Sequence, residues 1–133
     1  MEGKANNHTR RALSGLYPKT HIQFQNQLGD GISQVLIHCK DVNYGDDKGD
    51  QIVDDAQVYE FRFTPNPFYY PVFYCHFSSR NGVINEKVYN YRRDYKRCFK
   101  HCNYIIHNDA FYGINGNGDA DLIWLWKPPP KMI

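Results

Sequence analysis

Four cysteines set into alternating apolar segments constrain this 133-residue chain more than any other feature. Cys39 stands in Leu-Ile-His-Cys-Lys, Cys75 stands in Phe-Tyr-Cys-His-Phe, and Cys98 and Cys102 follow a basic run that begins at Tyr91. An even number of cysteines in a short strand-rich chain indicates two disulfide bonds, which persist in oxidising compartments. We therefore expect a secreted, extracellular protein, and a cytosolic protein with reduced thiols is the alternative.

The composition indicates one domain built mostly of β-strands. The chain contains 11 Tyr and 8 Phe, and aromatic residues favour strands. The formal net charge of +2 is too small to indicate nucleic acid as the main partner. No apolar run reaches the roughly 18 residues of a membrane span, so we expect no membrane insertion. The first residues lack the apolar segment of a signal peptide, so we expect a mature form.

The pattern divides the chain into three parts. Residues 1–19 are polar and lack periodicity, so we expect a flexible N-terminal segment. Asn7 begins an Asn-His-Thr sequon there and is the candidate glycosylation site. Residues 20–127 are expected to form the domain. Residues 128–133 open with three prolines, which end regular structure, and are expected to form a C-terminal tail.

Within the domain, apolar residues recur with period two, which predicts strands. The alternation begins at Thr20, Val35 and Tyr59, and further candidate strands span residues 70–77, 83–94, 102–107, 110–114 and 121–126. About eight short strands separated by Gly, Asn and Pro turns predict an all-β fold, an antiparallel β-sandwich stapled by two disulfides. We expect residues 41–55 to be the longest irregular connection, and helical structure only as a turn around residues 94–100.

The sequence offers little for catalysis, and we expect no catalytic residues. No serine lies in a Gly-x-Ser-x-Gly motif, and the cysteines are interpreted as disulfide-bonded. His38 and His76 adjoin cysteines, so on a strand each histidine faces away from the neighbouring sulfur, towards solvent. We interpret them as surface histidines. A small nuclease that uses His38, His76 or His101 as acid and base is the least favoured alternative.

No metal or other cofactor is expected. Cys98-x-x-His101-Cys102 offers three possible zinc ligands, whereas a structural zinc needs four. The stretch after Asp41 resembles a calcium loop, but an aspartate stands where the sharp turn requires glycine, and Ile52 stands where a glutamate belongs. We interpret these acidic residues as a solvated loop.

The most suggestive surface element spans residues 87–101, where basic and aromatic residues interleave. The basic residues are Arg92, Arg93, Lys96, Arg97 and Lys100, and the aromatic residues are Tyr89, Tyr91, Tyr95 and Phe99. Such a pattern can bind an anionic glycan or an acidic receptor patch through charge, or RNA through charge and stacking. We favour a protein or glycan partner over nucleic acid. A solvated face whose tyrosines belong to the core is the alternative.

Residues 21–114 resemble the plant self-incompatibility S-protein family. The matching segments are residues 21–28, 35–40, 46–47, 61–63, 66–68, 73–77, 88–89, 93–94, 98 and 102–106. The chain departs from the family pattern at Asp41, where serine is common, at Tyr104, where tryptophan is common, and at Ala110, where glycine is common. These replacements preserve strand character, so they affect the identity of the partner more than the fold.

The resemblance implies a small, secreted β-sandwich that is not an enzyme. Founding members resemble pistil ligands that a pollen-surface receptor recognises. We therefore expect a monomeric ligand in plant cell-cell signalling, in self-incompatibility or in reproductive or developmental signalling, with an unidentified cell-surface receptor protein as its partner. A secreted binder of anionic glycan or nucleic acid is the alternative.

Four cysteines allow three pairings. We favour the nested pairing Cys39–Cys102 and Cys75–Cys98, because a Cys98–Cys102 bond would close too small a loop to tie strands together. Recognition is expected on exposed loops, residues 41–55 and 78–85 among them, because loops can vary at little cost in stability. The candidate receptor-binding residues are Asp46, Asp47, Asp50, Tyr69, Tyr70, Arg80, Asn81, Arg92, Arg93, Lys96 and Arg97.

Overall fold

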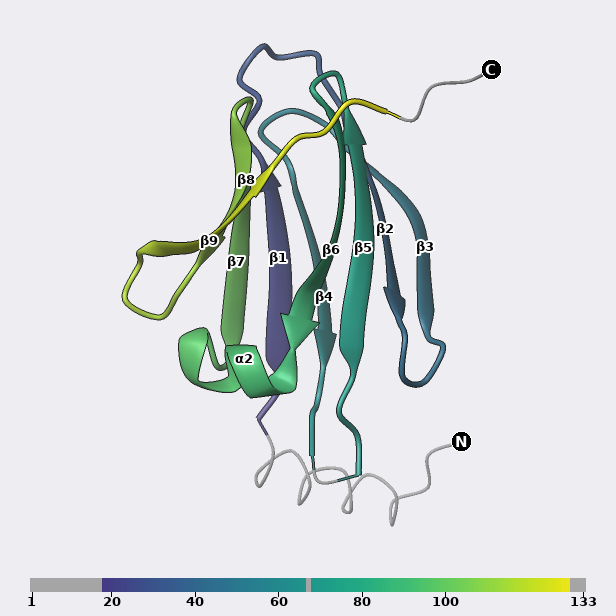
Figure 1. Ribbon diagram of the computed structural model, residues 1–133, viewed down its shortest axis with the longest axis vertical. Coiled ribbons are helices and arrows are strands. Elements are labelled where there is room, and N and C mark those ends of the chain that lie inside the picture. Colours follow the sequence, from purple (N-terminus) through teal and green to yellow (C-terminus); the bar gives the residue numbers. More distant parts are fainter. Residues whose placement is uncertain (1–17, 67, 130–133) are drawn as a thin grey trace.

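In the computed structural model, which describes residues 18–66 and 68–129, the chain forms nine strands and one short helix (Figure 1). The elements are β1 (Thr20–Asn26), β2 (Val35–Asp41), β3 (Asp47–Val53), β4 (Val58–Phe63), β5 (Val72–Ser79), β6 (Gly82–Asn90), α2 (Tyr91–Arg97), β7 (His101–Ile106), β8 (Ala110–Ile114) and β9 (Ala120–Leu125). The predicted all-β sandwich is confirmed. The predictions for residues 1–17, the Asn7 sequon included, lie outside the described residues.

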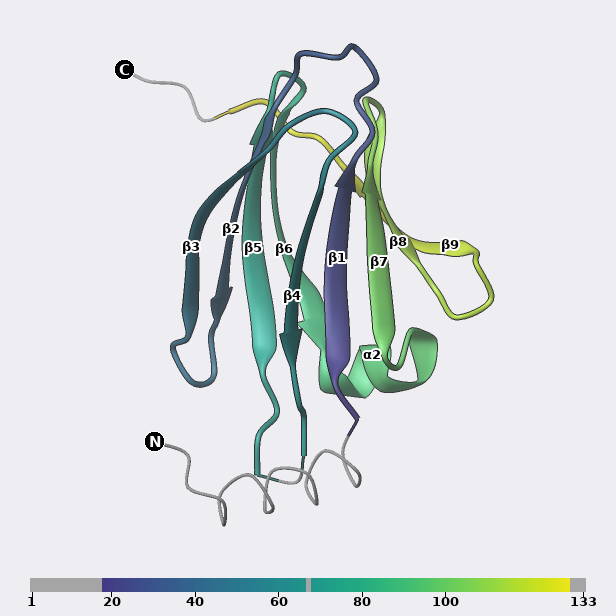
Figure 2. The ribbon, with the colours of Figure 1, turned by 180° about the vertical axis from the view of Figure 1, so that it is seen from behind.

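The strands form two sheets that face each other (Figures 1 and 2). One sheet has the order β4-β1-β7-β8-β9 and the other has the order β3-β2-β5-β6. All the paired strands are antiparallel except β1 and β7, which run parallel. Beyond β9 the chain crosses to the second sheet, where the Lys127 backbone exchanges hydrogen bonds of 2.8 and 3.0 Å with the Val83 backbone.

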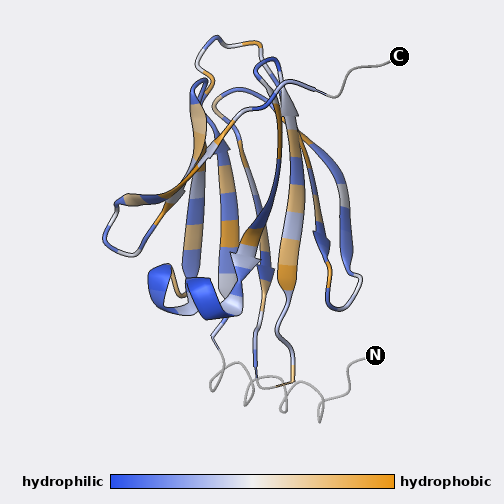
Figure 3. Cartoon of the chain, in the orientation of Figure 1, coloured by the Kyte–Doolittle hydropathy of each residue, from blue (hydrophilic) through white to orange (hydrophobic). Residues whose placement is uncertain are grey.

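Alternating apolar residues fill the space between the sheets. On β1, Ile22 and Phe24 are fully buried, and Figure 3 shows the alternation of apolar and polar residues along this strand. The Phe24 ring lies 5.3 Å from Phe77 of the opposite sheet and 5.4 Å from Tyr104 of its own sheet, measured between centroids. Each fully buried large side chain stabilises the fold by roughly 1.5 to 3 kcal/mol. This aromatic core makes the strands a firm scaffold for the loops.

The prediction of an irregular connection over residues 41–55 is wrong, because β3 occupies its middle. The strand lies at the edge of its sheet and pairs only with β2, with Ile52 opposite Leu36 and Asp50 opposite His38. Of its residues only Val53 is buried, and Ile52 is 66% exposed. An edge strand is held by backbone hydrogen bonds, so it needs no alternating apolar pattern. That pattern was the signal on which the sequence prediction relied.

The predicted strand over residues 83–94 ends early, because the helix α2 begins at Tyr91. The side chain of Asn90 accepts a hydrogen bond from the Arg92 amide at 3.1 Å, which caps the helix. The Asp94 carboxylate in turn accepts the Asn90 amide at 2.8 Å. In the described part of the chain, no helix is long and apolar enough to cross a membrane.

The favoured nested disulfide pairing is also wrong. Cys39 bonds to Cys75, and Cys98 bonds to Cys102. Cys39 and Cys75 face each other in the register of β2 and β5, with their Cα atoms 4.0 Å apart. Cys98 follows α2 and Cys102 lies in β7, so the second bond fixes the end of the helix to the next strand. A disulfide that closes such a short loop can therefore hold a helix end against a strand, which the sequence-based prediction did not consider.

Candidate recognition surface

Three segments meet at one end of the sandwich, at the lower end of Figures 1 and 2. Two of them are the connections from β2 to β3 and from β4 to β5, and their described residues, 42–46, 64–66 and 68–71, are called the loop platform here. The third is α2 with the residues that follow it, 91–100, called the helix ridge. Together they bring most of the predicted recognition residues onto one surface.

The two loops of the platform are joined by hydrogen bonds. The carboxylate of Asp41 is buried and accepts the amides of Asn43 at 2.9 Å and Val72 at 3.2 Å. The Asn43 side chain donates to the Tyr70 carbonyl at 2.8 Å, and the Tyr70 amide donates to the Tyr44 hydroxyl at 3.0 Å. The loops therefore form one unit rather than two independent segments.

Aromatic rings cover the loop platform. The rings of Tyr44 and Tyr69 lie 4.9 Å apart, and Tyr44 is 50% exposed. Phe68 is 89% exposed. Burial, followed by the nearby Asp41 and Asp46 carboxylates, raises the pKa of Tyr69 to about 12, so its phenol stays protonated at physiological pH. A large apolar side chain as exposed as Phe68, beside further rings, is typical of a contact surface.

The aromatic surface continues from the loop platform onto the helix ridge. Tyr70 lies 5.7 Å from Tyr91 between ring centroids, Tyr91 lies 5.1 Å from Tyr95, and Tyr95 lies 5.3 Å from Phe99. Tyr70, Tyr95 and Phe99 each remain more than two-fifths exposed. The rings thus form a continuous series that solvent, or a partner, can reach. By contrast, Tyr89 belongs to the core.

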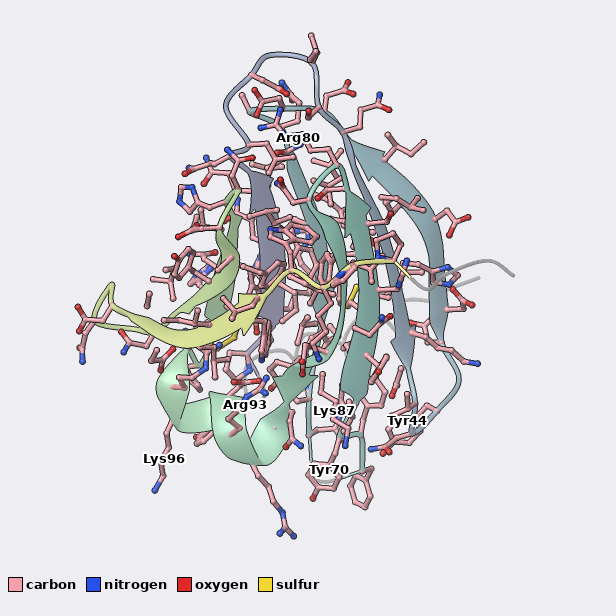
Figure 4. The ribbon with its side chains drawn as sticks, turned by 45° about the horizontal axis from the view of Figure 1, so that its top comes forward. Tyr44, Tyr70, Arg80, Lys87, Arg93 and Lys96 are labelled. Atoms are coloured by element: carbon pink, nitrogen blue, oxygen red, sulfur yellow. A yellow bond between two sulfur atoms is a disulfide. The ribbon has the colours of Figure 1, made fainter. Side chains whose placement is uncertain are left out.

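Three basic side chains of the helix ridge face solvent. Arg92, Lys96 and Lys100 are exposed, and none of them forms an ion pair with a carboxylate of residues 18–66 or 68–129. Figure 4 shows Lys96 pointing away from the helix into solvent. Cations without an internal partner are available to an anionic ligand.

The other two predicted arginines of this segment hold the helix in place. Asp94 is fully buried, and its carboxylate accepts hydrogen bonds from Arg93 at 2.7 and 2.8 Å and from Arg97 at 2.8 Å. Arg97 is only 8% exposed and also pairs with Asp121 at 2.7 Å. Burial of this network gives Arg97 a structural task, whereas Arg92 and Lys96 have none that the contacts reveal.

A hollow of about 490 Å³ lies where the loop platform meets the helix ridge. It is lined by Asn43, Tyr70, Val72, Asn90, Tyr91 and Arg92. Two aromatic rings, two side-chain amides and a guanidinium group therefore converge on one space. Small binding sites combine these features, with an apolar wall and a few polar groups that orient the ligand.

Arg80 and Asn81 lie at the opposite end, in the turn between β5 and β6 (Figure 4). Arg80 pairs with Asp30 and donates to the Asn108 side chain at 2.6 Å, and Asn81 donates to the same oxygen at 3.0 Å. The Ser33 hydroxyl, two backbone amides and Arg80 lower the pKa of Asp30 to about 2. These contacts hold the loops at that end together. Because they lie at the opposite end of the sandwich, Arg80 and Asn81 are separate from the other candidates.

The acidic candidates already have partners, in β2 or in β3. The ring of His38 makes hydrogen bonds to Asp47 at 2.6 Å and to Asp50 at 2.7 Å, one through each nitrogen. Because each nitrogen faces a carboxylate, this arrangement requires the doubly protonated ring, and the pKa of His38 is raised, chiefly by Asp47. Asp46 pairs with Lys48 at 2.9 Å.

The sequence reasoning did not single out Tyr44 and Phe68. Both are large aromatic residues next to turn-forming residues, and this context is the signal that could have pointed to them. Tyr44 and Asn43 do lie within the predicted recognition stretch 41–55, but the contact of Asn43 with Tyr70 was not predicted, because it joins loops that are 27 residues apart in sequence.

Comparison with known proteins adds an independent observation. Residues 21–126 match a family model described as plant self-incompatibility protein S1. S-protein homolog 24 of Arabidopsis thaliana is 31% identical to this chain over 97 residues, which cover 71% of the chain and 59% of that relative. The chain therefore spans less than two thirds of the length of this relative. No solved structure matches the chain.

Proposed function

The chain belongs to the plant self-incompatibility protein S1 family, and we propose that it is a secreted, non-catalytic signalling ligand that a cell-surface receptor recognises through the loop platform. One observation carries this proposal. The platform exposes Phe68, Tyr44 and Tyr70 on two loops that hydrogen bonds join to each other on a disulfide-bonded body. Preordered aromatic side chains supply much of the binding energy of protein interfaces.

The disulfides support secretion. All four cysteines of the sequence are paired, in Cys39–Cys75 and Cys98–Cys102. Structural disulfides of this kind are rare in the reducing cytosol and common in small secreted domains. The family match points in the same direction, since we expect its members to act between cells.

The surroundings of the histidines support a role without catalysis. Carboxylates occupy both ring nitrogens of His38, and the ring of its cross-strand neighbour His76 is bonded to Asn85 at 2.7 Å. His101 belongs to the other sheet and stacks on His21, with 4.9 Å between the ring centroids. An acid and base pair needs two such groups with free nitrogens around one substrate. This arrangement therefore favours the ligand over the nuclease alternative.

The test is binding of the tagged protein to plant cells that bind the wild type. Phe68→Ala removes the most exposed apolar side chain of the platform and should weaken binding by about tenfold or more, as expected at an interface hot spot. Ile32→Ala is the matched control, because Ile32 is 83% exposed in the connection between β1 and β2. Both variants should melt like the wild type, since neither side chain is buried.

The proposal fails if Phe68→Ala binds as tightly as the wild type, or if Ile32→Ala loses as much. Crosslinking on the same cells, followed by protease treatment of the cell surface, checks the kind of partner. Binding that survives complete proteolysis of surface proteins would also contradict a receptor protein.

A further inference from the structure

A short repeat in the sequence becomes a geometric repeat on the helix ridge. An aromatic residue followed by a basic residue recurs every four positions, as Tyr91-Arg92, Tyr95-Lys96 and Phe99-Lys100. Residues four apart lie on the same side of a helix, about 6 Å apart along the axis. The ridge therefore carries one row of rings and, beside it, one row of cations.

The structure extends both rows beyond the end of the helix. α2 ends at Arg97, and Phe99 adopts a positive φ of 51°. Its ring nevertheless lies 5.3 Å from that of Tyr95, so the row of rings is unbroken. The Lys100 ammonium group lies 5.6 Å from the Phe99 ring centroid, so this last ring also has a cation beside it.

The helix ridge is held in place without the side chains of Arg92 and Lys96. Arg93 donates to the Val88 carbonyl of β6 and Arg97 pairs with Asp121 of β9, which fixes the inner side of the helix, and the Cys98–Cys102 bond fixes its end. Arg92 and Lys96 take no part in either attachment. The positive charges of these two side chains therefore remain available to a ligand.

We propose that the helix ridge binds an acidic polysaccharide, a linear chain of uronic acid residues. Such a chain carries one carboxylate per sugar, which the row of cations complements, and apolar C–H faces, which pack on the row of rings. The hollow at the Tyr91 end adds the Asn43 side-chain oxygen and the Asn90 side-chain nitrogen for sugar hydroxyls, because the other atom of each amide already bonds to Tyr70 or Arg92. The proposal goes beyond receptor recognition and rests on the proposed function only in placing the protein outside the cell.

The arrangement of the rings favours this polymer over single-stranded nucleic acid. Bases bind by lying flat on open ring faces. Here Tyr95 and Phe99 meet edge to face at 85°, and Tyr91 and Tyr95 are tilted by 34° in close contact. The rings therefore cover part of one another's faces. A sugar packs its C–H groups on a single accessible ring face, so it does not need neighbouring rings with open faces, as successive stacked bases do.

The experiment titrates the protein with oligogalacturonate of defined length by calorimetry at about 50 and 200 mM salt. The double variant Arg92→Ala/Lys96→Ala should lose about tenfold or more in affinity, and its weaker salt dependence should show that charge contacts were removed. Arg62→Ala/Lys127→Ala is the matched control, because it removes the same charge from exposed positions outside the ridge, and it should bind within about twofold of the wild type.

Two further probes separate the contributions of rings and charge. Tyr95→Ala keeps every cation and should still weaken binding several-fold, because it breaks the row of rings. Neutral dextran should not bind, and monomeric galacturonate should bind far more weakly than an oligomer that spans the row. Melting temperatures of all variants show that the fold is kept.

Several outcomes would overturn the proposal. They are the absence of oligogalacturonate binding, equal binding by the ridge variant, or binding of poly(U) RNA as tight as that of the uronate polymer. Phe68→Ala should leave polymer binding unchanged. Both proposals expect Phe68→Ala to lose cell binding and keep polymer binding. Unchanged cell binding of this variant contradicts only the proposed function, whereas a wild type that binds cells but not oligogalacturonate contradicts only the polymer proposal.

Discussion

The carboxylate of Asp94 accepts the Nε hydrogen of Arg97 at 2.8 Å, and solvent barely reaches either side chain, which are 0% and 8% exposed. Arg93 makes two further hydrogen bonds to the same carboxylate. Arg93 also donates to the Val88 carbonyl of β6 and Arg97 pairs with Asp121 of β9, so the two arginines held by Asp94 attach α2 to the end of the sandwich. The exposed rows of the helix ridge depend on this attachment for their position.

Asp94→Asn is expected to destabilise the protein strongly. The substitution leaves the nearly buried Arg97 and the partly buried Arg93 without their counter-charge, and breaking a buried pair in this way typically costs about 3 to 5 kcal/mol. Urea unfolding measures the loss. Arg92→Ala, on the exposed side of the same helix, should change stability by less than about 0.5 kcal/mol. Equal stability of both variants would mean that the Asp94 network does not hold the helix.

The two disulfides should contribute unequally to stability. Cys39–Cys75 closes a loop of 36 residues and Cys98–Cys102 closes a loop of 4. On the chain-entropy estimate, replacing the first pair by alanine costs about 4 kcal/mol and replacing the second costs about 2 kcal/mol. Denaturant unfolding of the two double variants gives both values. A larger loss from the short loop would contradict this account.

Peptide mapping without reduction checks the pairing behind that prediction. Trypsin cuts after Lys40 and Lys100, so it separates Cys39 from Cys75 and Cys98 from Cys102. The tripeptide Cys98-Phe99-Lys100 should be found joined to the peptide that begins at His101. Its attachment to the Cys75 peptide would restore the nested pairing.

Gly82→Ala should disrupt the closure between the sheets. Gly82 has a φ of +126°, and an added Cβ would collide with the backbone oxygen of Lys127, which bonds to the Val83 amide. We expect a loss of at least about 2 kcal/mol. Gly118→Ala is the control, because Gly118 also has a positive φ but faces open space, so only the backbone cost of about 1 kcal/mol applies. Similar melting temperatures for the two variants would rule out the collision.

His38 should make stability depend on pH in the neutral range. Its pKa is raised in the folded protein, first by the hydrogen bond to Asp47 and then by that to Asp50, so the folded state holds the proton more tightly than the unfolded chain. The stabilisation is complete below the ordinary histidine pKa of about 6.5 and is lost as the pH rises through the raised value. His38→Gln should therefore lower the melting temperature more at about pH 5.5 than at about pH 9. A pH-independent difference would show that the ring acts only by packing.

The alternation of apolar and polar residues was sufficient to predict a strand where one face of that strand is buried. Ile22 and Phe24 alternate with polar residues, and the strand around them was found. It was insufficient for β3, because an edge strand is held by its backbone and its side chains carry no period. It also misjudged α2, whose start depends on the Asn90 cap and on the hydrogen bond from the Asn90 amide to the buried Asp94 carboxylate.

The candidate site, too, was predicted only in part from the sequence. The alternation of basic and aromatic residues from Tyr91 to Lys100 was visible in the sequence, but not which of them face solvent. Arg92 and Arg97 are the same residue type, and only the ion pair of Arg97 with the buried Asp94 distinguishes their roles. Tyr44 belongs to this surface because its hydroxyl accepts a hydrogen bond from the Tyr70 amide in the other loop.

The sequence by itself determined the sheet-built core, the presence of paired cysteines and the resemblance to a family, because these follow from local alternation and from motifs read along the chain. Tertiary structure alone decided that Cys39 meets Cys75, that Arg97 is buried while Lys96 is free, and that two distant loops form one platform. Each of these depends on strand register and sheet packing, which bring together residues that no local pattern connects.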